Sequence, residues 1–283
     1  MTLSRRAFLG AAAAGALTPA SARSLKNICA QLYTVRTVLP EKPLETLQAL
    51  EKIGYREVEV TQAGLDKIWP ALKKTRMKPV SIHIDAALLA PGKERELDAA
   101  VADAKDRKFD FVAYPVMLPE DRGGAAEMRS FAARLNHLGI KCRDAGMKLC
   151  YHNHAFEFEP KDGKLPLEMI MEGTDKELVG LELDIFWAAA AGHDPVGLLE
   201  KYAGRVPLLH LKDKPADLLV KPNEPVPRTA FKEVGAGSLD IAAVLRAAHA
   251  AGVRHYIVEQ DQTPGDPVES MRQSFEYLRK LNF

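Results

Sequence analysis

The sequence is poor in cysteine, carries almost no net charge and has no long apolar run beyond its first 22 residues. Its three cysteines, Cys29, Cys142 and Cys150, have spacings that form no disulfide framework, so we expect buried core residues. A formal charge of +1 over 283 residues offers no concentrated basic face for nucleic acid. The composition therefore argues against a disulfide-stapled scaffold and against a nucleic-acid-binding protein.

Residues 1–22 have the features of a cleavable export signal. The segment Ser4–Gly10 (SRRAFLG) is a twin-arginine motif, the apolar run AAAAGALTPA follows it, and Ala20–Ala22 provides a small-residue cleavage pattern. A membrane-anchoring helix is the alternative, but Pro19 interrupts the run before the ~20 residues that a membrane span needs. We therefore expect a mature domain over residues 23–283, periplasmic or secreted, with no membrane partner after cleavage.

Strand-like and helical patterns alternate along the rest of the chain. The predicted strands, the first with its exit loop, cover residues 27–35, 56–61, 78–84, 109–116, 148–152, 178–184, 206–211 and 256–259. The predicted helices cover residues 42–53, 65–74, 94–107, 125–145, 165–172, 196–202, 239–251 and 268–281.

This alternation predicts a parallel sheet whose strands are joined by right-handed crossovers. Eight such units close into a (β/α)8 TIM barrel, with the active site at the carboxyl ends of the strands. An open doubly wound sheet is the alternative, but it would place a glycine-rich loop after the first strand, where QLYTVRT has no glycine. We predict a single-domain barrel, with Lys214–Ala236 as a loop or lid over the end of the seventh strand.

Four acidic or imidazole side chains lie at comparable positions near the ends of four successive strands: His152, Asp184, His210 and Glu259. A lone histidine within an apolar run is usually a core residue, whereas a buried carboxylate needs a cation or hydrogen-bond donors. Because four strands offer such groups together, we predict that they share one divalent metal ion. Mixed oxygen and nitrogen ligation suits Mn²⁺, Zn²⁺, Co²⁺ or Mg²⁺, and the sequence does not choose among these.

The fifth strand offers further candidates in the segment YHNHAFEF. Strand alternation puts His152 and His154 on one face, and Glu157 lies in the loop beyond, where it either reaches back into the pocket or bonds its own backbone. The candidate catalytic residues are Glu259, Glu157 and His152. The candidate substrate contacts are His83, His154, Trp187 and Lys212, with a core or supporting role as the alternative for His83 and Lys212.

Several motifs, in order, resemble those of the sugar phosphate isomerase/epimerase group of xylose-isomerase-like barrels. They are QLYTVR, GYREVEV, YHNHAFEF, LELDIFW with AGHDP, HLKD, and VGAGSLD followed by IVEQD. The resemblance covers residues 27–283. It implies a divalent metal ion held by strands five to eight, and Asp184, His210 and Glu259 match the expected ligands.

The fifth strand departs from this group, whose epimerases usually place a glutamate where this chain has His152. In those enzymes, glutamates of the fifth and eighth strands exchange protons on opposite faces of the substrate. Here Glu157 would supply the missing carboxylate, or a histidine would transfer the proton, since its ordinary pKa of ~6.5 suits neutrality.

The leading functional prediction is a metal-dependent isomerase or epimerase that acts on a sugar or keto-sugar through a metal-stabilised enediolate. The alternatives are a keto-sugar or inositol-type lyase or dehydratase on the same site, and a non-catalytic sugar-binding protein. A related metal-dependent DNA endonuclease is disfavoured by the charge and by the export signal. The expected partner is a small sugar-type molecule, and assembly as a homo-oligomer stays open.

Overall fold

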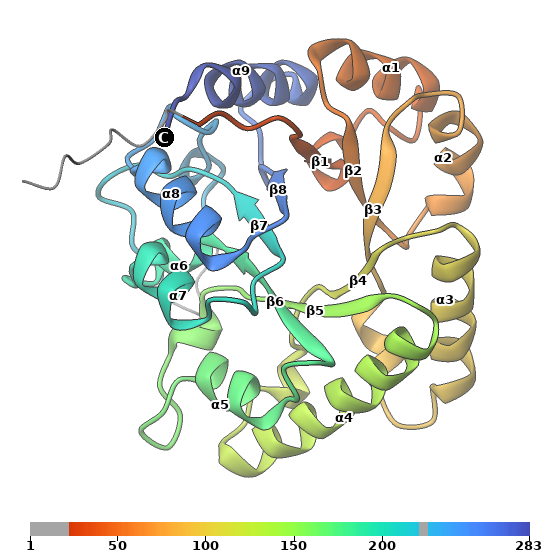
Figure 1. Ribbon diagram of the computed structural model, residues 1–283, viewed down its shortest axis with the longest axis vertical. Coiled ribbons are helices and arrows are strands. Elements are labelled where there is room, and N and C mark those ends of the chain that lie inside the picture. Colours follow the sequence, from red (N-terminus) through yellow and green to blue (C-terminus); the bar gives the residue numbers. More distant parts are fainter. Residues whose placement is uncertain (1–22, 221–225) are drawn as a thin grey trace, which may run out of the picture.

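Eight parallel strands pair in sequence order and close into a barrel in the computed structural model, which describes residues 23–220 and 226–283 (Figure 1). β1 pairs with both β2 and β8, which closes the ring. The predicted single (β/α)8 barrel is confirmed, and the predicted signal peptide lies outside the described residues. The strands are β1 (Cys29–Gln31), β2 (Glu57–Thr61), β3 (Lys78–His83), β4 (Phe111–Tyr114), β5 (Lys148–His152), β6 (Val179–Asp184), β7 (Leu208–Leu211) and β8 (His255–Val258).

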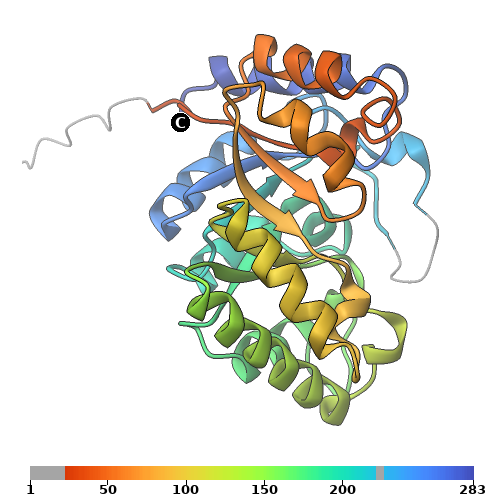
Figure 2. The same cartoon turned by 90° about the vertical axis from the view of Figure 1, so that its right-hand side faces the viewer.

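Helices cover the outside of the barrel, and Figure 2 shows α1 to α4 along one of its sides. The helices are α1 (Pro43–Ile53), α2 (Leu65–Leu72), α3 (Glu94–Asp106), α4 (Ala125–Asp144), α5 (Pro166–Gly173), α6 (Ile185–Ala190), α7 (Pro195–Lys201), α8 (Ile241–Ala251) and α9 (Pro267–Lys280). The sequence pattern predicts all of these except α6. Six residues are too few for helical periodicity to show, so α6 is recognisable only from its cap.

Alternation along each strand separates an outer apolar core from a polar barrel interior. On β2, Val58 and Val60 belong to the large core that the helices cover, whereas Glu59 points the other way, toward the barrel axis. A small apolar cluster fills the interior toward the amino-terminal ends of the strands and consists of Cys29, Val80, Phe111, Cys150, Leu208 and Ile257. All three cysteines are buried and free, as predicted. The polar side chains therefore collect toward the carboxyl ends.

The segment after β7 folds back against the carboxyl rim. Lys232 forms an antiparallel bridge with Asp213, and Phe231 packs with Phe186 and Trp187. This agrees with the predicted loop over the end of β7, apart from residues 221–225, which are not described. Among the helices in the described parts of the chain, none is long and apolar enough to cross a membrane.

Candidate active site

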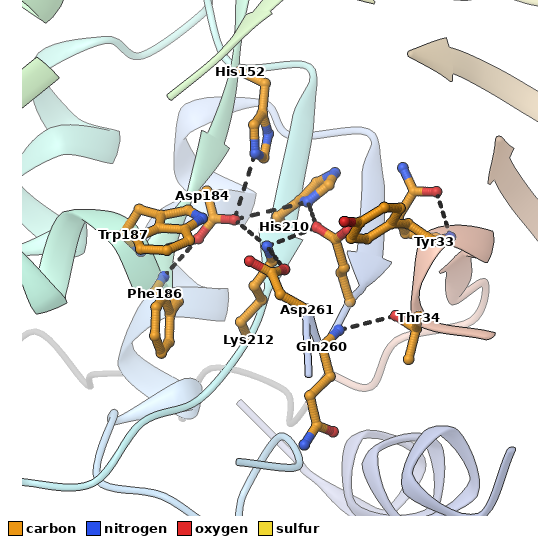
Figure 3. Close-up of polar contacts among 12 residues, drawn as sticks. Tyr33, Thr34, His152, Asp184, Phe186, Trp187, His210, Lys212, Gln260 and Asp261 are labelled. Atoms are coloured by element: carbon orange, nitrogen blue, oxygen red, sulfur yellow. Dashed lines mark hydrogen bonds and ion pairs between the residues drawn. The ribbon is translucent and has the colours of Figure 1, made fainter. Parts of the chain in front are cut away.

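The four predicted metal ligands converge at the carboxyl rim. His152 ends β5, Asp184 ends β6, His210 lies on β7, and Glu259 follows β8 directly. Each offers one ligand atom, and these atoms all lie within 4.8 Å of one another. His210 Nδ1 lies 2.9 Å from Glu259 Oε2, and His152 Nε2 lies 3.7 Å from Asp184 Oδ2. All four side chains are buried, so the barrel brings together groups that are far apart in the sequence. Figure 3 shows His152, Asp184 and His210 pointing toward one another.

Asp184 is oriented by the start of α6. Its Oδ1 accepts hydrogen bonds from the backbone N–H groups of Phe186 at 2.9 Å and Trp187 at 3.1 Å. Its buried Oδ2 forms an ion pair with the Lys212 ammonium, 2.9 Å away. A buried carboxylate oxygen requires a positive charge nearby, so the local fold turns this oxygen toward Lys212 and the cluster.

Lys212 extends from the end of β7 into a ring of carboxylates (Figure 3). Its Nζ lies 2.9 Å from Asp184, 2.7 Å from Glu259 and 2.6 Å from Asp261. Burial opposes the charge on this ammonium, but Asp184, Asp261 and Glu259 outweigh burial and raise the pKa of Lys212 well above its usual range. Three carboxyl groups around one ammonium give the rim more acidic than basic groups, which favours the binding of a further cation.

A second polar layer, which was not predicted from the sequence, lies beneath this rim. Glu59 of β2 and Glu182 of β6 are fully buried in the barrel interior. His83 Nε2 lies 2.8 Å from Glu182 Oε2 and 3.1 Å from Glu59 Oε1, so one imidazole bridges both carboxylates. A signal existed, because alternation places Glu59 inside in EVEVT and puts Glu182 on the same face as Asp184 in LELD.

The carboxylates and imidazoles of these two layers shift one another's pKa values in opposite directions. Burial opposes ionisation of Glu59, but His83 and His210 outweigh it and hold its pKa well below the usual range. Burial and then Glu59 raise the pKa of Glu182. Burial lowers the pKa of His83, but Glu59 and Glu182 outweigh it and raise the value to about 10. The lower layer is thus a mixed-charge network that holds His83 in its cationic form.

The imidazoles near the rim also differ from one another in pKa. Burial, followed by His210, lowers the pKa of His152 well below its usual value. Burial, followed by Lys212, lowers the pKa of His154 to about 3. Burial opposes the charge on His210, but Glu182 and Glu59 raise its pKa well above the usual value. His152 and His154 are therefore neutral near pH 7, the form in which an imidazole accepts a proton or binds a metal ion.

A cavity of about 1020 Å³ opens above the cluster. All four predicted substrate contacts, His83, His154, Trp187 and Lys212, line it, together with Glu259 and Asp261. The rings of His154 and Trp187 lie 5.2 Å apart, and Phe231 from the loop after β7 is 5.9 Å from Trp187. The cavity thus has an aromatic wall and a charged floor, which suits a substrate ring that carries hydroxyl groups. The roles of these residues stay predictions.

Glu157 lies apart from the rim cluster. One of its oxygens accepts a hydrogen bond from the Tyr151 hydroxyl, and the other accepts the His154 backbone N–H at 2.9 Å. Tyr151 packs against Phe131 of α4, on the outer side of the sheet. Burial raises the pKa of Glu157 to about 7, against the hydrogen bond from Tyr151. Of the three candidate catalytic residues, the structure brings Glu259 and His152 to the rim and leaves Glu157 outside it.

Asp261 is a rim residue that was not predicted from the sequence, although it ends the motif IVEQD. It lines the cavity and pairs with Lys212. Burial raises its pKa to about 6, against the effect of Lys212. Glu259 behaves in the opposite way: burial opposes its ionisation, but Lys212 and His210 hold its pKa well below the usual range. Two carboxylates of one rim therefore have different proton affinities.

The donor set fits a divalent metal ion. His152, Asp184, His210 and Glu259 combine two imidazoles with two carboxylates, and the buried Oδ2 of Asp184 faces both the cluster and the Lys212 ammonium. Such ligation occurs with Mn²⁺, Zn²⁺, Co²⁺ and Mg²⁺, and the geometry does not select one of them. A second group with ligand atoms equally close, His83, His152, Glu182 and His210, shares two of its members.

The fold and this site define the class as an α/β barrel with buried imidazole and carboxylate groups that could bind a metal ion. Residues 47–281 match the xylose isomerase-like TIM barrel family, and the chain belongs to that family. The predicted resemblance is confirmed at this level. The prediction of an enzyme is confirmed as well.

Several curated relatives are named inosose dehydratase. The protein from Geobacillus kaustophilus (strain HTA426) is 31% identical over 166 residues, which cover 55% of this chain and 53% of the relative. The protein from Clostridium beijerinckii (strain ATCC 51743 / NCIMB 8052) is 29% identical over 164 residues, or 54% of each chain. The chain thus spans about half the length of the curated relatives it matches.

Solved structures share the fold over most of the chain. A sugar phosphate isomerase/epimerase from Parabacteroides distasonis ATCC 8503 superposes with a TM-score of 0.76 at 22% identity, covering 92% of this chain and 96% of the other. The IOLI protein, solved with a bound zinc atom, has a TM-score of 0.69 at 17% identity, covering 88% and 95%. At these identities the likeness establishes the fold.

Proposed function

We propose that the protein is a metal-dependent lyase that removes a proton next to a carbonyl of a keto-sugar or inosose-like substrate and eliminates a neighbouring hydroxyl as water. The observation that carries this proposal is the asymmetry of the rim. Glu259 faces His152, whereas the resemblance to sugar epimerases implies a second glutamate at that position. One carboxylate base beside a cation suffices for elimination, and the relatives named inosose dehydratase support this reaction.

Each rim residue has a role in this proposal. His152, Asp184, His210 and Glu259 would hold the divalent ion, which supplies the positive charge that polarises the substrate carbonyl. Glu259 removes the proton, because it is ionised and lines the cavity. The buried Lys212 ammonium stabilises negative charge on substrate oxygens.

Two further groups complete the reaction. Asp261 has a pKa of about 6, so it can hold a proton near neutrality and pass it to the departing hydroxyl. The rings of Trp187 and Phe231 would pack against the apolar face of the substrate and exclude water. Glu157 has no role here, since both of its oxygens accept hydrogen bonds elsewhere.

Isomerisation or epimerisation is the second candidate. It requires a partner for Glu259 that transfers a proton on the other side of the substrate, and the neutral imidazoles of His152 and His154 both line the cavity. Solved structures named sugar phosphate isomerase/epimerase support this candidate through their fold. The metal ion and the first proton transfer are the same in both reactions, so the product distinguishes them.

The test is a screen of keto-sugars and inososes with metal-loaded protein in deuterated water, followed by mass spectrometry. We expect a product that is lighter by one water. Deuterium uptake without loss of water would show that the protein is an isomerase and not a lyase. Binding without any reaction would indicate a non-catalytic sugar-binding protein. Glu259→Gln, kept loaded with metal as verified by elemental analysis, should lower the exchange rate by about 10²–10⁴-fold. Undiminished exchange would remove Glu259 as the base.

The remaining expectations stay predictions. They are twin-arginine export to the periplasm or beyond, the identity of the metal ion among Mn²⁺, Zn²⁺, Co²⁺ and Mg²⁺, and assembly as a homo-oligomer.

A further inference from the structure

We propose that Glu59 and Glu182 are positioning residues, which fix the tautomers and ring orientations of His210 and His152 so that one nitrogen of each faces the metal ion. The inference rests on the proposed metal site at the rim. It assigns a role to the buried lower layer, which the proposed reaction does not use.

Each of the two histidines lies between a rim carboxylate and a lower one. His210 Nδ1 is 2.9 Å from Glu259 Oε2 at the rim, and its Nε2 is 2.7 Å from Glu59 Oε1 below. His152 Nε2 is 3.7 Å from Asp184 Oδ2 at the rim, and its Nδ1 is 3.3 Å from Glu182 Oε2 below, a close charge contact without hydrogen-bond geometry. A metal-binding imidazole commonly donates its other N–H to a carboxylate, which holds the ring and raises the basicity of the ligand nitrogen.

The two lower carboxylates are themselves held in place. Gln31 Nε2 donates to Glu59 Oε1 at 2.7 Å, and the His83 ring lies between Glu59 and Glu182 at 3.1 and 2.8 Å. The side chains of Glu59 and Glu182 have no exposed surface. A buried carboxylate with fixed partners has few alternative positions, so it restrains the imidazole that faces it, through a hydrogen bond for Glu59 and His210 and through a close charge contact for Glu182 and His152.

A second metal ion in the lower layer is the competing explanation, since His83, His152, Glu182 and His210 also bring four ligand atoms together. Such an ion would need the nitrogens of His210 and His152 that face Glu59 and Glu182. A nitrogen that carries a proton for a carboxylate has no free electron pair for a metal ion. The two explanations therefore predict different tautomers and different metal stoichiometries.

The experiment measures Zn²⁺ dissociation constants by chelator competition, and the visible spectrum of the Co²⁺-loaded protein, for Glu59→Gln and Glu182→Gln. We expect each variant to bind Zn²⁺ about 10–100-fold more weakly and to have a changed Co²⁺ spectrum. The matched control is Glu57→Gln. Glu57 lies on the same strand two residues earlier and pairs with His255 at 2.8 Å, toward the opposite end of the barrel. The control should bind Zn²⁺ as the unmodified protein does.

A second measurement needs no substitution and so does not depend on the variants folding. Nitrogen-15 NMR of the histidine rings in the Zn²⁺-loaded protein should show the proton of His210 on Nε2 and that of His152 on Nδ1. The opposite tautomers, unchanged Zn²⁺ affinity in both folded variants, or a second tight Zn²⁺ equivalent lost in His83→Ala would each overturn the inference while leaving the rim site intact. Failure of the unmodified protein to bind any metal ion would instead remove the proposed function and this inference together.

Discussion

At the scale of single residues, the sequence identifies the rim and misses what supports it. His152, Asp184, His210 and Glu259 were predictable because each lies near the end of an apolar strand, where a buried polar group needs an explanation. Glu59 and Glu182 lie inside strands, and their burial shows only when the closed barrel places them beside His83. Sequence spacing reports which face a residue lies on but not which residue it meets across the barrel.

Glu157 allows a test of how the raised pKa of one buried carboxyl group affects stability. Its pKa of about 7 in the folded state exceeds the ordinary 4.5, so folding takes up a proton between these two pH values. The contribution of Glu157 to the free energy of unfolding should therefore be fully present below pH 4.5 and should be lost as the pH rises to about 7. The loss amounts to at most about 3 kcal/mol, since one pKa unit corresponds to about 1.4 kcal/mol.

The variant Glu157→Gln cannot ionise, so it should lack this dependence. Urea unfolding at pH 5 and pH 8 measures the free energy of unfolding of both proteins. The variant should be more stable, relative to the unmodified protein, at pH 8 than at pH 5. An equal difference at both pH values would mean that the carboxyl does not titrate in this range.

At the scale of elements, the eight strands and the eight longer helices follow from alternation of patterns, and their observed bounds lie close to the predicted ones. α6 is the exception. The side chain of Asp184 caps this helix by accepting hydrogen bonds from the N–H groups of Phe186 and Trp187. A helix of six residues is too short to show helical periodicity in the sequence. That short helix matters for the site, because capping occupies one oxygen of Asp184 and leaves the other for the cluster.

The packing of α4 against the residue before β6 depends on Gly139. A Cβ added at Gly139 would lie 2.9 Å from the Cβ of Leu178 and 3.2 Å from its carbonyl oxygen. Gly139→Ala should therefore destabilise the fold by about 1–3 kcal/mol, despite the better helix propensity of alanine. Ser130→Ala on the exposed face of the same helix is the control and should leave stability close to unchanged. Chemical unfolding of both variants checks this, and a stabilised Gly139→Ala would show that α4 moves outward at no cost.

At the scale of the whole molecule, ring closure creates the site. The register of the strands brings His152 beside Glu182, and Asp184 beside His210, although these residues are 30 and 26 positions apart. Alternation of strands and helices predicts the barrel, and the barrel predicts one shared rim. The side-chain distances at that rim depend on strand stagger and on the packing of neighbouring side chains, which no periodicity encodes.

The central claim is that four strands deliver ligands to one cation, and anomalous X-ray diffraction from crystals soaked in Mn²⁺ or Zn²⁺ tests it most directly. The account predicts a single strong peak bounded by His152, Asp184, His210 and Glu259, with Lys212 beside it. A saturated crystal with no peak there, and with the Lys212 ammonium alone between Asp184 and Glu259, would contradict the account.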